Sequence, residues 1–241
     1  VRIFMPVDSR NLRRFYDSPR GQIAHGYIAQ RLGERLGEAK GRRVLGIGYA
    51  TPYLEPFLDG AERVIAAEPV WGRATPWPPE KRGLSVTVEE HYLPFPDAFF
   101  DRVVVIHGLE TADGTRRFLR EIWRVLADEG RLILVVPNRV SFWAQLDRTP
   151  FGFGHPFSNA QLQRLLEDTL FEVEEWDTAL FIPPFGWRAP SLGQAFERVG
   201  HRFWPRLAGV HIVETTKSLY AGVPADSVRA RRIKLILAGA R

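Results

Sequence analysis

The sequence predicts an α/β protein whose core is a doubly wound, mostly parallel sheet, with an antiparallel edge strand and a C-terminal covering segment. Three observations predict this class. Short apolar runs alternate with helical patterns between residues 43 and 138, which is the pattern of βαβ units. A glycine turn joins the first run directly to a helix-start signal. After residue 138 the chain changes to loops rich in glycine, proline and aromatic residues, and its later strands are expected to pair antiparallel.

The composition narrows the class of protein. The 241 residues can bury one sizeable core, and 45% hydrophobic with 25% charged residues is a globular balance. Because no apolar signal segment and no long apolar run occurs, we expect a cytoplasmic protein without an integral membrane segment. The absence of cysteine excludes disulfides and thiolate nucleophiles, and no metal site is predicted. A net charge of +5 permits an anionic partner but favours an ordinary solvated surface.

The N-terminal part is expected to open irregularly and then to form an amphipathic helix. Its apolar residues recur at helical spacing, so this helix should pack on the first strand of the sheet. The residues on that face are Ile23, Tyr27, Ile28, Leu32 and Leu36.

The first strand and its turn follow. Residues 43–45 are the end of a short buried strand, and Gly46 and Gly48 then allow a tight turn and close approach of a ligand or another backbone. Thr51 predicts a helix N-cap, because its hydroxyl can accept from a free amide, and Pro52 suits the first helical position. This strand, turn and helix start together form the kind of cradle that holds nucleotide-like ligands.

Four further apolar runs and one helical pattern complete the parallel sheet. The helix covers residues 115–126, and a turn at residues 128–130 leads from it into the last of these strands. The strands are predicted at residues 63–68, 84–88, 100–106 and 131–136.

Beyond the parallel part, a loop at residues 149–157 precedes a capping box at residues 158–161, which opens a helix through Leu170. A strand at 171–182, a helix at 192–204 and an antiparallel partner strand at 210–220 follow.

Ordered segments between Arg43 and Asn138 resemble the class I S-adenosylmethionine-dependent methyltransferases, and the whole chain resembles a bacterial branch of unknown substrate. The segments are Leu93-Pro94-Phe95-Pro96-Asp97, Phe100-Asp101, His107-Gly108-Leu109-Glu110, Leu119-Arg120-Glu121, Arg124-Val125-Leu126 and Gly130-Arg131-Leu132. The resemblance implies a Rossmann-like core that binds S-adenosylmethionine. We therefore divide the chain into an N-terminal helical segment (1–42), a cofactor-binding core (43–138), a lid and strand pair that complete the same domain (139–222), and a basic tail (223–241).

The resemblance also implies a cofactor site. Glu68 takes the place of the acid that binds both ribose hydroxyls, since a carboxylate offers two acceptor oxygens. Glu89, with the amide of Glu90, matches the adenine-reading position, and His107 ends a strand beside the expected methyl group. The remaining cofactor-binding candidates are Tyr16, Gly46, Gly48 and Ala50.

Each of these roles has a simpler alternative. Glu68 and Glu89 can be ordinary surface carboxylates at strand ends, and His107 can be a packed, hydrogen-bonded histidine instead of a cofactor contact or a catalytic base. Tyr16 can close over the cofactor, but core packing is favoured.

One position departs from the family pattern. The family usually has an acid at position 46, where this chain has glycine, so a charge-assisted contact to the amino-acid end of the cofactor is lost. We expect weak binding, around tens to hundreds of micromolar. If the turn tolerates a side chain, Gly46→Asp should tighten it.

The leading function is methyl transfer to a small, apolar or lipid-like acceptor. Aromatic residues of segments 139–160 and 181–190 are expected to cover the strand ends near His107 and enclose the acceptor, although they can equally be simple packing. The alternative is a degenerate methyltransferase fold that serves as a non-catalytic binding or regulatory protein and binds a protein partner or a ligand. Methylation of RNA or of a ribosomal protein is the weakest hypothesis, because the arginines are scattered and no nucleic-acid-binding module is recognisable.

Overall fold

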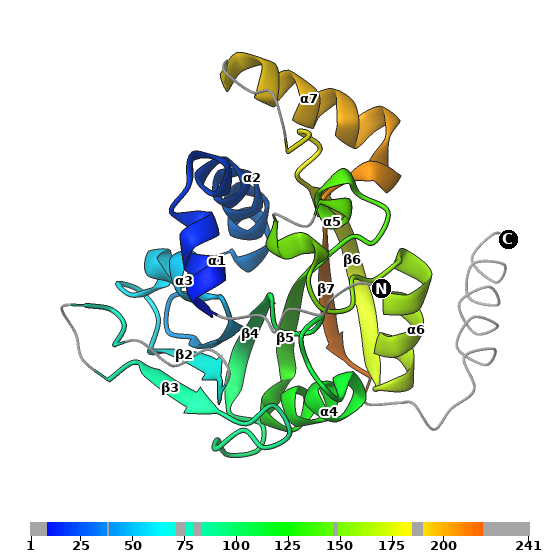
Figure 1. Cartoon of the computed structure of the whole chain (residues 1–241). Coiled ribbons are helices and arrows are strands. Elements are labelled where there is room, and N and C mark those ends of the chain that lie inside the picture. Colours follow the sequence, from blue (N-terminus) through cyan, green and yellow to red (C-terminus); the bar gives the residue numbers. More distant parts are fainter. Residues whose placement is uncertain are drawn as a thin grey trace, which may run out of the picture.

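The computed structural model describes residues 9–37, 39–70, 76–79, 83–146, 149–184 and 190–218. Its sheet has the strand order β3-β2-β1-β4-β5-β7-β6 (Figure 1). All pairs from β3 to β5 are parallel, whereas β7 is antiparallel to both β5 and β6. The predicted fold class is confirmed. The strands are β1 (Arg43–Gly48), β2 (Arg63–Pro69), β3 (Ser85–Val88), β4 (Phe100–Ile106), β5 (Leu126–Pro137), β6 (Phe171–Ala179) and β7 (Val210–Lys217).

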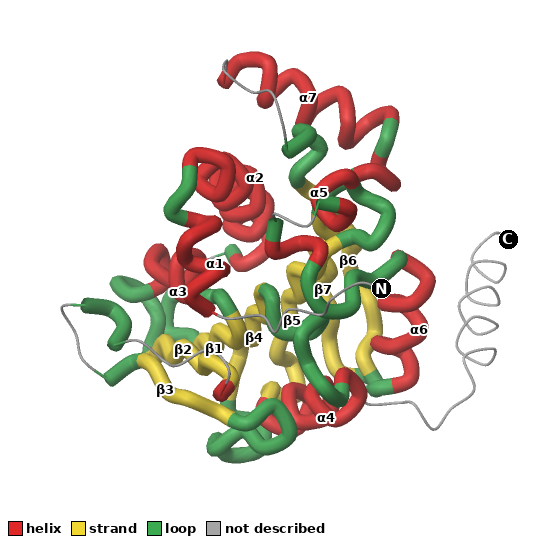
Figure 2. Tube along the Cα trace, in the orientation of Figure 1, coloured by secondary structure: helices red, strands yellow, loops and turns green. Residues whose placement is uncertain are grey.

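Helices cover both faces of this sheet (Figure 2). Successive strand residues point to opposite faces, so β1 divides its side chains between two cores. Val44 packs with the helices α2 and α3, while Leu45 and Ile47 pack with α4 and α6. The helical segments are α1 (Ser9–Tyr16), α2 (Pro19–Leu36), α3 (Thr51–Leu54), η1 (Glu55–Phe57), α4 (Thr115–Val125), α5 (Phe142–Gln145), η3 (Pro150–Gly152), α6 (Asn159–Asp168), α7 (Pro190–Phe203) and η4 (Pro205–Leu207).

The structure corrects the predicted start of the first helix after β1. Strand β1 continues through Gly48, three residues beyond the predicted end, and Ala50 rather than Thr51 occupies the N-cap position, without a side-chain cap. Helix α3 lasts one turn and then tightens into the 3₁₀ turn η1. Pro56 accounts for this, because it has no backbone N–H to continue the α-helical pattern.

The N-terminal part contains more helix than predicted. Residues expected to be irregular form α1, and Ser18 then caps α2 by accepting a hydrogen bond from the amide of Gly21. Ile23 is exposed, so it does not belong to the buried face of α2. The predicted turn at residues 128–130 lies inside β5, where the pairing with β4 shifts register.

The C-terminal elements follow the prediction with small differences in their ends. The capping box at Ser158 is confirmed, and α6 ends at Asp168. Strand β6 ends at Ala179, three residues before the predicted end. The basic tail predicted at residues 223–241 lies outside the described residues. Within the described residues, no helix is both long and apolar enough to cross a membrane.

The motif that suggested the family has a structural explanation. The Arg124 guanidinium on α4 donates to the backbone carbonyls of Leu93 and Phe95, at 2.8 and 2.9 Å, and pairs with Asp97 at 2.6 Å. It also holds Glu121, lowering the pKa of that carboxyl, and Glu121 in turn accepts from the amide of Leu93. These contacts join the loop before β4 to α4. The motif residues Arg124 and Glu121 therefore stabilise the fold and are not part of the candidate site.

Stability is expected to fall in mild acid because of one buried imidazole. His211 lies in β7 against Trp176, and burial lowers its pKa to about 4. The unfolded chain takes up this proton near its ordinary pKa of about 6.5, so the loss begins there and ends near the folded pKa. We expect a cost of about 3 kcal/mol over that interval. Urea unfolding of the wild type and His211→Phe across this pH range measures it, and parallel pH profiles for the two proteins would exclude His211 as the cause.

Candidate functional site

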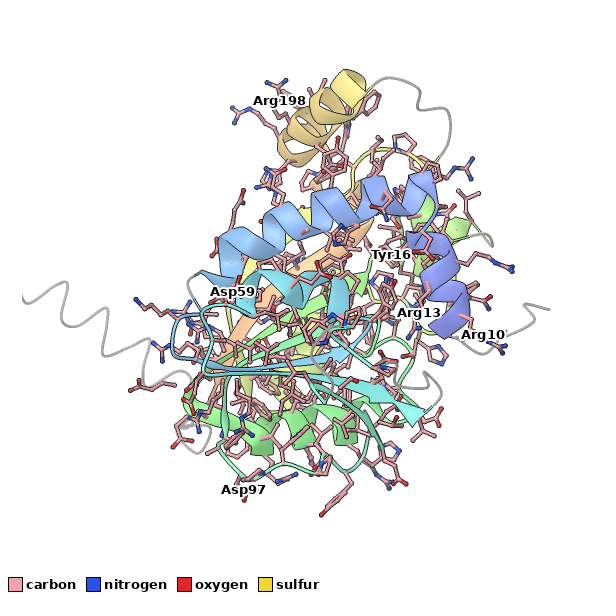
Figure 3. The ribbon with its side chains drawn as sticks, turned by 90° about the vertical axis from the view of Figure 1, so that its left-hand side faces the viewer. Arg10, Arg13, Tyr16, Asp59, Asp97 and Arg198 are labelled. Atoms are coloured by element: carbon pink, nitrogen blue, oxygen red, sulfur yellow. The ribbon has the colours of Figure 1, made fainter. Side chains whose placement is uncertain are left out.

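The carboxyl ends of β1, β2 and β4 meet beneath α1. Gly48 pairs with Ile106 and Ile47 with Ala67, so the three strands end at one edge of the sheet. Figure 3 labels Arg13 and Tyr16 on the helix α1, which reaches this edge. Open parallel sheets bind their ligands at this edge, where the strand order changes direction, and β1 and β4 are the strands at that change.

Gly48 makes the close approach that the sequence predicted. Its φ is +81°, and a Cβ atom there would lie 2.3 Å from the carbonyl oxygen of Ile106. The next residue, Tyr49, donates its amide to the same carbonyl at 2.7 Å. Only glycine therefore fits this crossing between the turn after β1 and the end of β4.

Gly46 is enclosed for a different reason. It lies on the same face of β1 as Val44, and a Cβ atom there would stand 2.7 Å from the Cβ of Ala50 and 2.5 Å from Cδ1 of Leu54. Both neighbours are buried: Ala50 is the N-cap of α3 and Leu54 is its last residue. The sequence predicts tighter cofactor binding for Gly46→Asp only if a side chain fits at this position. The structure leaves no space for one.

His107 is held by partners on both sides. Its Nδ1 lies 2.8 Å from Oε1 of Glu110, and its Nε2 lies 2.8 Å from the hydroxyl of Tyr16. The exposed fractions are 3% for His107, 1% for Glu110 and 3% for Tyr16. Burial raises the pKa of Tyr16 well above its ordinary value, so its hydroxyl stays protonated and donates to Nε2. With Nε2 accepting from Tyr16, the Nδ1 atom of the imidazole carries a proton and donates it to Glu110.

Aromatic side chains surround this chain of hydrogen bonds. The ring of Tyr49 stacks on that of Tyr16 at 4.9 Å between centroids, and burial raises the pKa of Tyr49 to about 12. Phe151 lies 5.2 Å from the His107 ring and contacts Trp143. Phe151 and Trp143, from the segment predicted to cover the strand ends, are thus near His107, but both are core side chains. Phe185 and Trp187, predicted for the same cover, lie outside the described residues.

The three predicted carboxylates differ in their positions. Glu68 is 7% exposed at the end of β2, and its Oε2 lies 3.6 Å from the Arg13 guanidinium of α1. Glu89 is exposed beyond β3, the edge strand. Glu90 accepts a hydrogen bond from the amide of Asp113, so its carboxylate supports the adjacent loop.

The structure therefore brings together Glu68, the β1 turn, Tyr16 and His107. Glu89 follows the end of β3, which pairs with the end of β2 at Glu68, and Glu90 supports the neighbouring loop. Sequence reasoning assigned no role to Arg13, Tyr49 or Glu110. The spacing of His107 and Glu110 was the available signal, since three residues can bring an imidazole and a carboxylate together across a turn.

The residues present fit the nucleoside part of a cofactor. Glu68 offers two acceptor oxygens where a ribose is expected, and the turn at Gly48 leaves backbone close to the edge. Within the described part of the chain, Oε2 of Glu110 is a buried acceptor without a hydrogen-bond partner. This oxygen can therefore accept a further hydrogen bond. No group of three or more potential metal ligands occurs among the described residues.

Comparisons with known proteins agree with this geometry. Residues 45–134 match the family model described as a methyltransferase domain. A probable S-adenosylmethionine-dependent methyltransferase of Mycolicibacterium smegmatis is 33% identical over 157 residues, covering 63% of this chain and 59% of that protein. A malonyl-[acyl-carrier protein] O-methyltransferase of Halorhodospira halophila is 29% identical over 143 residues, covering 53% of this chain and 48% of that protein.

Solved structures share the fold. The crystal structure of an S-adenosylmethionine-dependent methyltransferase from Thermotoga maritima has a TM-score of 0.62 at 20% identity, covering 86% of this chain and 95% of that one. In the sequence comparisons, this chain spans only about half to three fifths of the length of the two curated relatives. Taken with the strand order, these matches show that residues 45–134 resemble a methyltransferase domain and that the sheet has the fold of S-adenosylmethionine-dependent methyltransferases.

Proposed function

We propose that this protein transfers the methyl group of S-adenosylmethionine to a small or apolar acceptor. The observation that carries the proposal is the buried chain Tyr16–His107–Glu110 beside the glycine turn of β1. When bound, S-adenosylmethionine supplies a methyl group activated on a sulfonium. The protein mainly has to align the two reactants and exclude water. The aromatic residues around His107 suit both tasks, and they favour an apolar acceptor.

A proton has to leave an acceptor that reacts through O–H or N–H. Tyr16 can take this proton on its oxygen while its own proton moves to Nε2 of His107. The resulting imidazolium is stabilised by the carboxylate of Glu110, which already accepts the Nδ1 proton. Since the pKa of Tyr16 is raised, its phenolate alone is too scarce at neutral pH to act as a base, and the relay needs the histidine.

Glu68 is assigned to the ribose hydroxyls. In the structure the Glu68 carboxylate pairs with Arg13, so a bound ribose and Arg13 would compete for the same oxygen atoms. Replacing Glu68 by glutamine keeps the shape but exchanges one of its two acceptor oxygens for an amide nitrogen, so one hydrogen bond to a charged acceptor is lost. Such a bond is worth about 1.5–3 kcal/mol, or at least about tenfold in affinity.

Calorimetric titration with S-adenosylmethionine and its demethylated product tests this assignment. Glu68→Gln should bind both at least about tenfold more weakly than the wild type. Glu172→Gln, an exposed carboxylate on β6, is the matched control and should bind as the wild type does. Equal affinity of Glu68→Gln and the control, both folded by circular dichroism, would contradict the ribose role.

The second candidate is a binding protein without catalysis. Gly46 in place of the family's acid favours it, and so does Tyr16, which occupies the outer nitrogen of His107. The same titration separates the two proposals. Binding by the wild type at about tens to hundreds of micromolar supports the enzyme, whereas no binding at millimolar cofactor supports the binding protein.

A further inference from the structure

The outward side of α7 and η4 carries large apolar side chains that no other described element covers. Two of them follow helical spacing along α7, and two continue the patch into the turn after it. Exposed apolar patches on folded proteins often mark interaction surfaces. The residues, with exposed fractions between 42% and 65%, are Val199, Phe203, Trp204 and Leu207.

Arginines accompany this patch at intervals of four residues. Arg198, Arg202 and Arg206 are all exposed, and Figure 3 shows Arg198 directed away from the body of the molecule. The only carboxylate between residues 190 and 207 is Glu197. It points inward and accepts from the amides of residues 180, 181 and 182, at 3.2, 2.6 and 3.1 Å. The exposed part of α7 and η4 therefore carries apolar side chains together with cationic ones.

Strand pairing places this segment at the site edge of the sheet. The last residue of β6, Ala179, pairs with Val210, which pairs with Pro137 at the end of β5. Helix α7 consequently leaves from the edge where β4 ends at His107, and Figure 1 shows it set apart from the sheet.

A chain of contacts joins α7 to the site. Glu197 holds the amide of Ile182, whose carbonyl accepts from the Trp143 indole at 2.7 Å. Trp143 contacts Phe151, which contacts His107.

We propose that this face of α7 and η4 docks on a membrane surface that contains anionic lipids. Helices that lie in a bilayer interface combine aromatic and aliphatic side chains with arginines, and tryptophan favours the headgroup level. The arginines would contact lipid phosphates, while Phe203 and Trp204 enter the boundary of the acyl region. A second copy of the chain is a poor occupant, because two such faces would oppose arginine to arginine. The proposal does not depend on the proposed function.

Vesicle sedimentation with the full chain tests it. The protein should bind vesicles of phosphatidylcholine mixed with phosphatidylglycerol, should not bind phosphatidylcholine alone, and should dissociate as salt rises. Each arginine near such a surface contributes about 1 kcal/mol, so Arg198→Gln/Arg202→Gln should bind about 25-fold more weakly. Trp204→Ser should also reduce binding.

Two control variants carry comparable substitutions at exposed positions outside α7 and η4. Arg117→Gln/Arg120→Gln removes two exposed arginines from α4, and Tyr92→Ser removes a side chain that is 68% exposed. Both should bind the mixed vesicles as the wild type does. The proposal is overturned if the mixed vesicles do not bind, if phosphatidylcholine alone binds equally, or if the α7 variants bind no more weakly than their controls. It is also overturned if the variants instead abolish self-association measured by ultracentrifugation.

Discussion

Gly46→Asp is expected to unfold more readily than the wild type and to bind S-adenosylmethionine less well, although it restores the family's acid. Its Cβ would stand 2.7 Å from Ala50 Cβ and 2.5 Å from Leu54 Cδ1, which are buried at the two ends of α3. Overpacking of this kind costs about 1–3 kcal/mol, and an unpaired carboxylate in the same place adds to it. We expect a loss of at least about 3 kcal/mol, or roughly 10 °C in Tm.

Thermal unfolding of three variants separates the contributions. Gly46→Ala measures the steric part alone, and Gly46→Ala/Ala50→Gly should recover some of it by removing the nearest Cβ. Gly33→Asp on α2 is the control for adding a charge at a glycine, because a Cβ there meets nothing within 4 Å. A Gly46→Asp protein as stable as Gly33→Asp, with tighter cofactor binding, would show that α3 moves aside and that the acid acts as in the family.

The second large effect is expected at His107, where a single substitution leaves a buried charge without a partner. His107→Asn suits the backbone, since asparagine tolerates the left-handed conformation found there (φ +53°). Its shorter side chain cannot reach both Tyr16 and Glu110, so the Glu110 carboxylate, 1% exposed, loses its hydrogen-bonded partner. Leaving a buried acceptor unsatisfied costs about 1–3 kcal/mol, and more when the acceptor is charged.

A double-mutant cycle distinguishes structure from chemistry. His107→Asn/Glu110→Gln removes the charge as well, so its stability should return most of the way to that of the wild type. Methyl transfer, measured once an acceptor is found, should remain at least about 100-fold reduced in both variants, because the proton relay is absent. If activity recovers together with stability, the histidine has only a structural role. If His107→Asn alone is as stable as the wild type, the coupling between His107 and Glu110 is not what the geometry indicates.

The family motif depends on contacts between segments that are close in the sequence, whereas the site joins residues that are far apart in it. Residues 93–97 and 119–126 are recognisable because their roles are local, and Arg124 joins them through contacts to nearby backbone. The site instead joins Tyr16 to His107, which are 91 residues apart in the sequence. No local pattern specifies that hydrogen bond.

The sequence alone predicts the α/β class, the parallel strands between residues 43 and 138 and the antiparallel strand pair that follows. It can do so because hydrophobic periodicity indicates which face of each element is buried. It also located the glycine turn, Glu68 and His107. Only the tertiary structure decided what these residues face: α1 closes on the sheet edge through Arg13 and Tyr16, and α3 occupies the space beside Gly46. The physical reason is that burial follows from local pattern, whereas the partner of a buried polar group depends on elements distant in the chain that packing brings together.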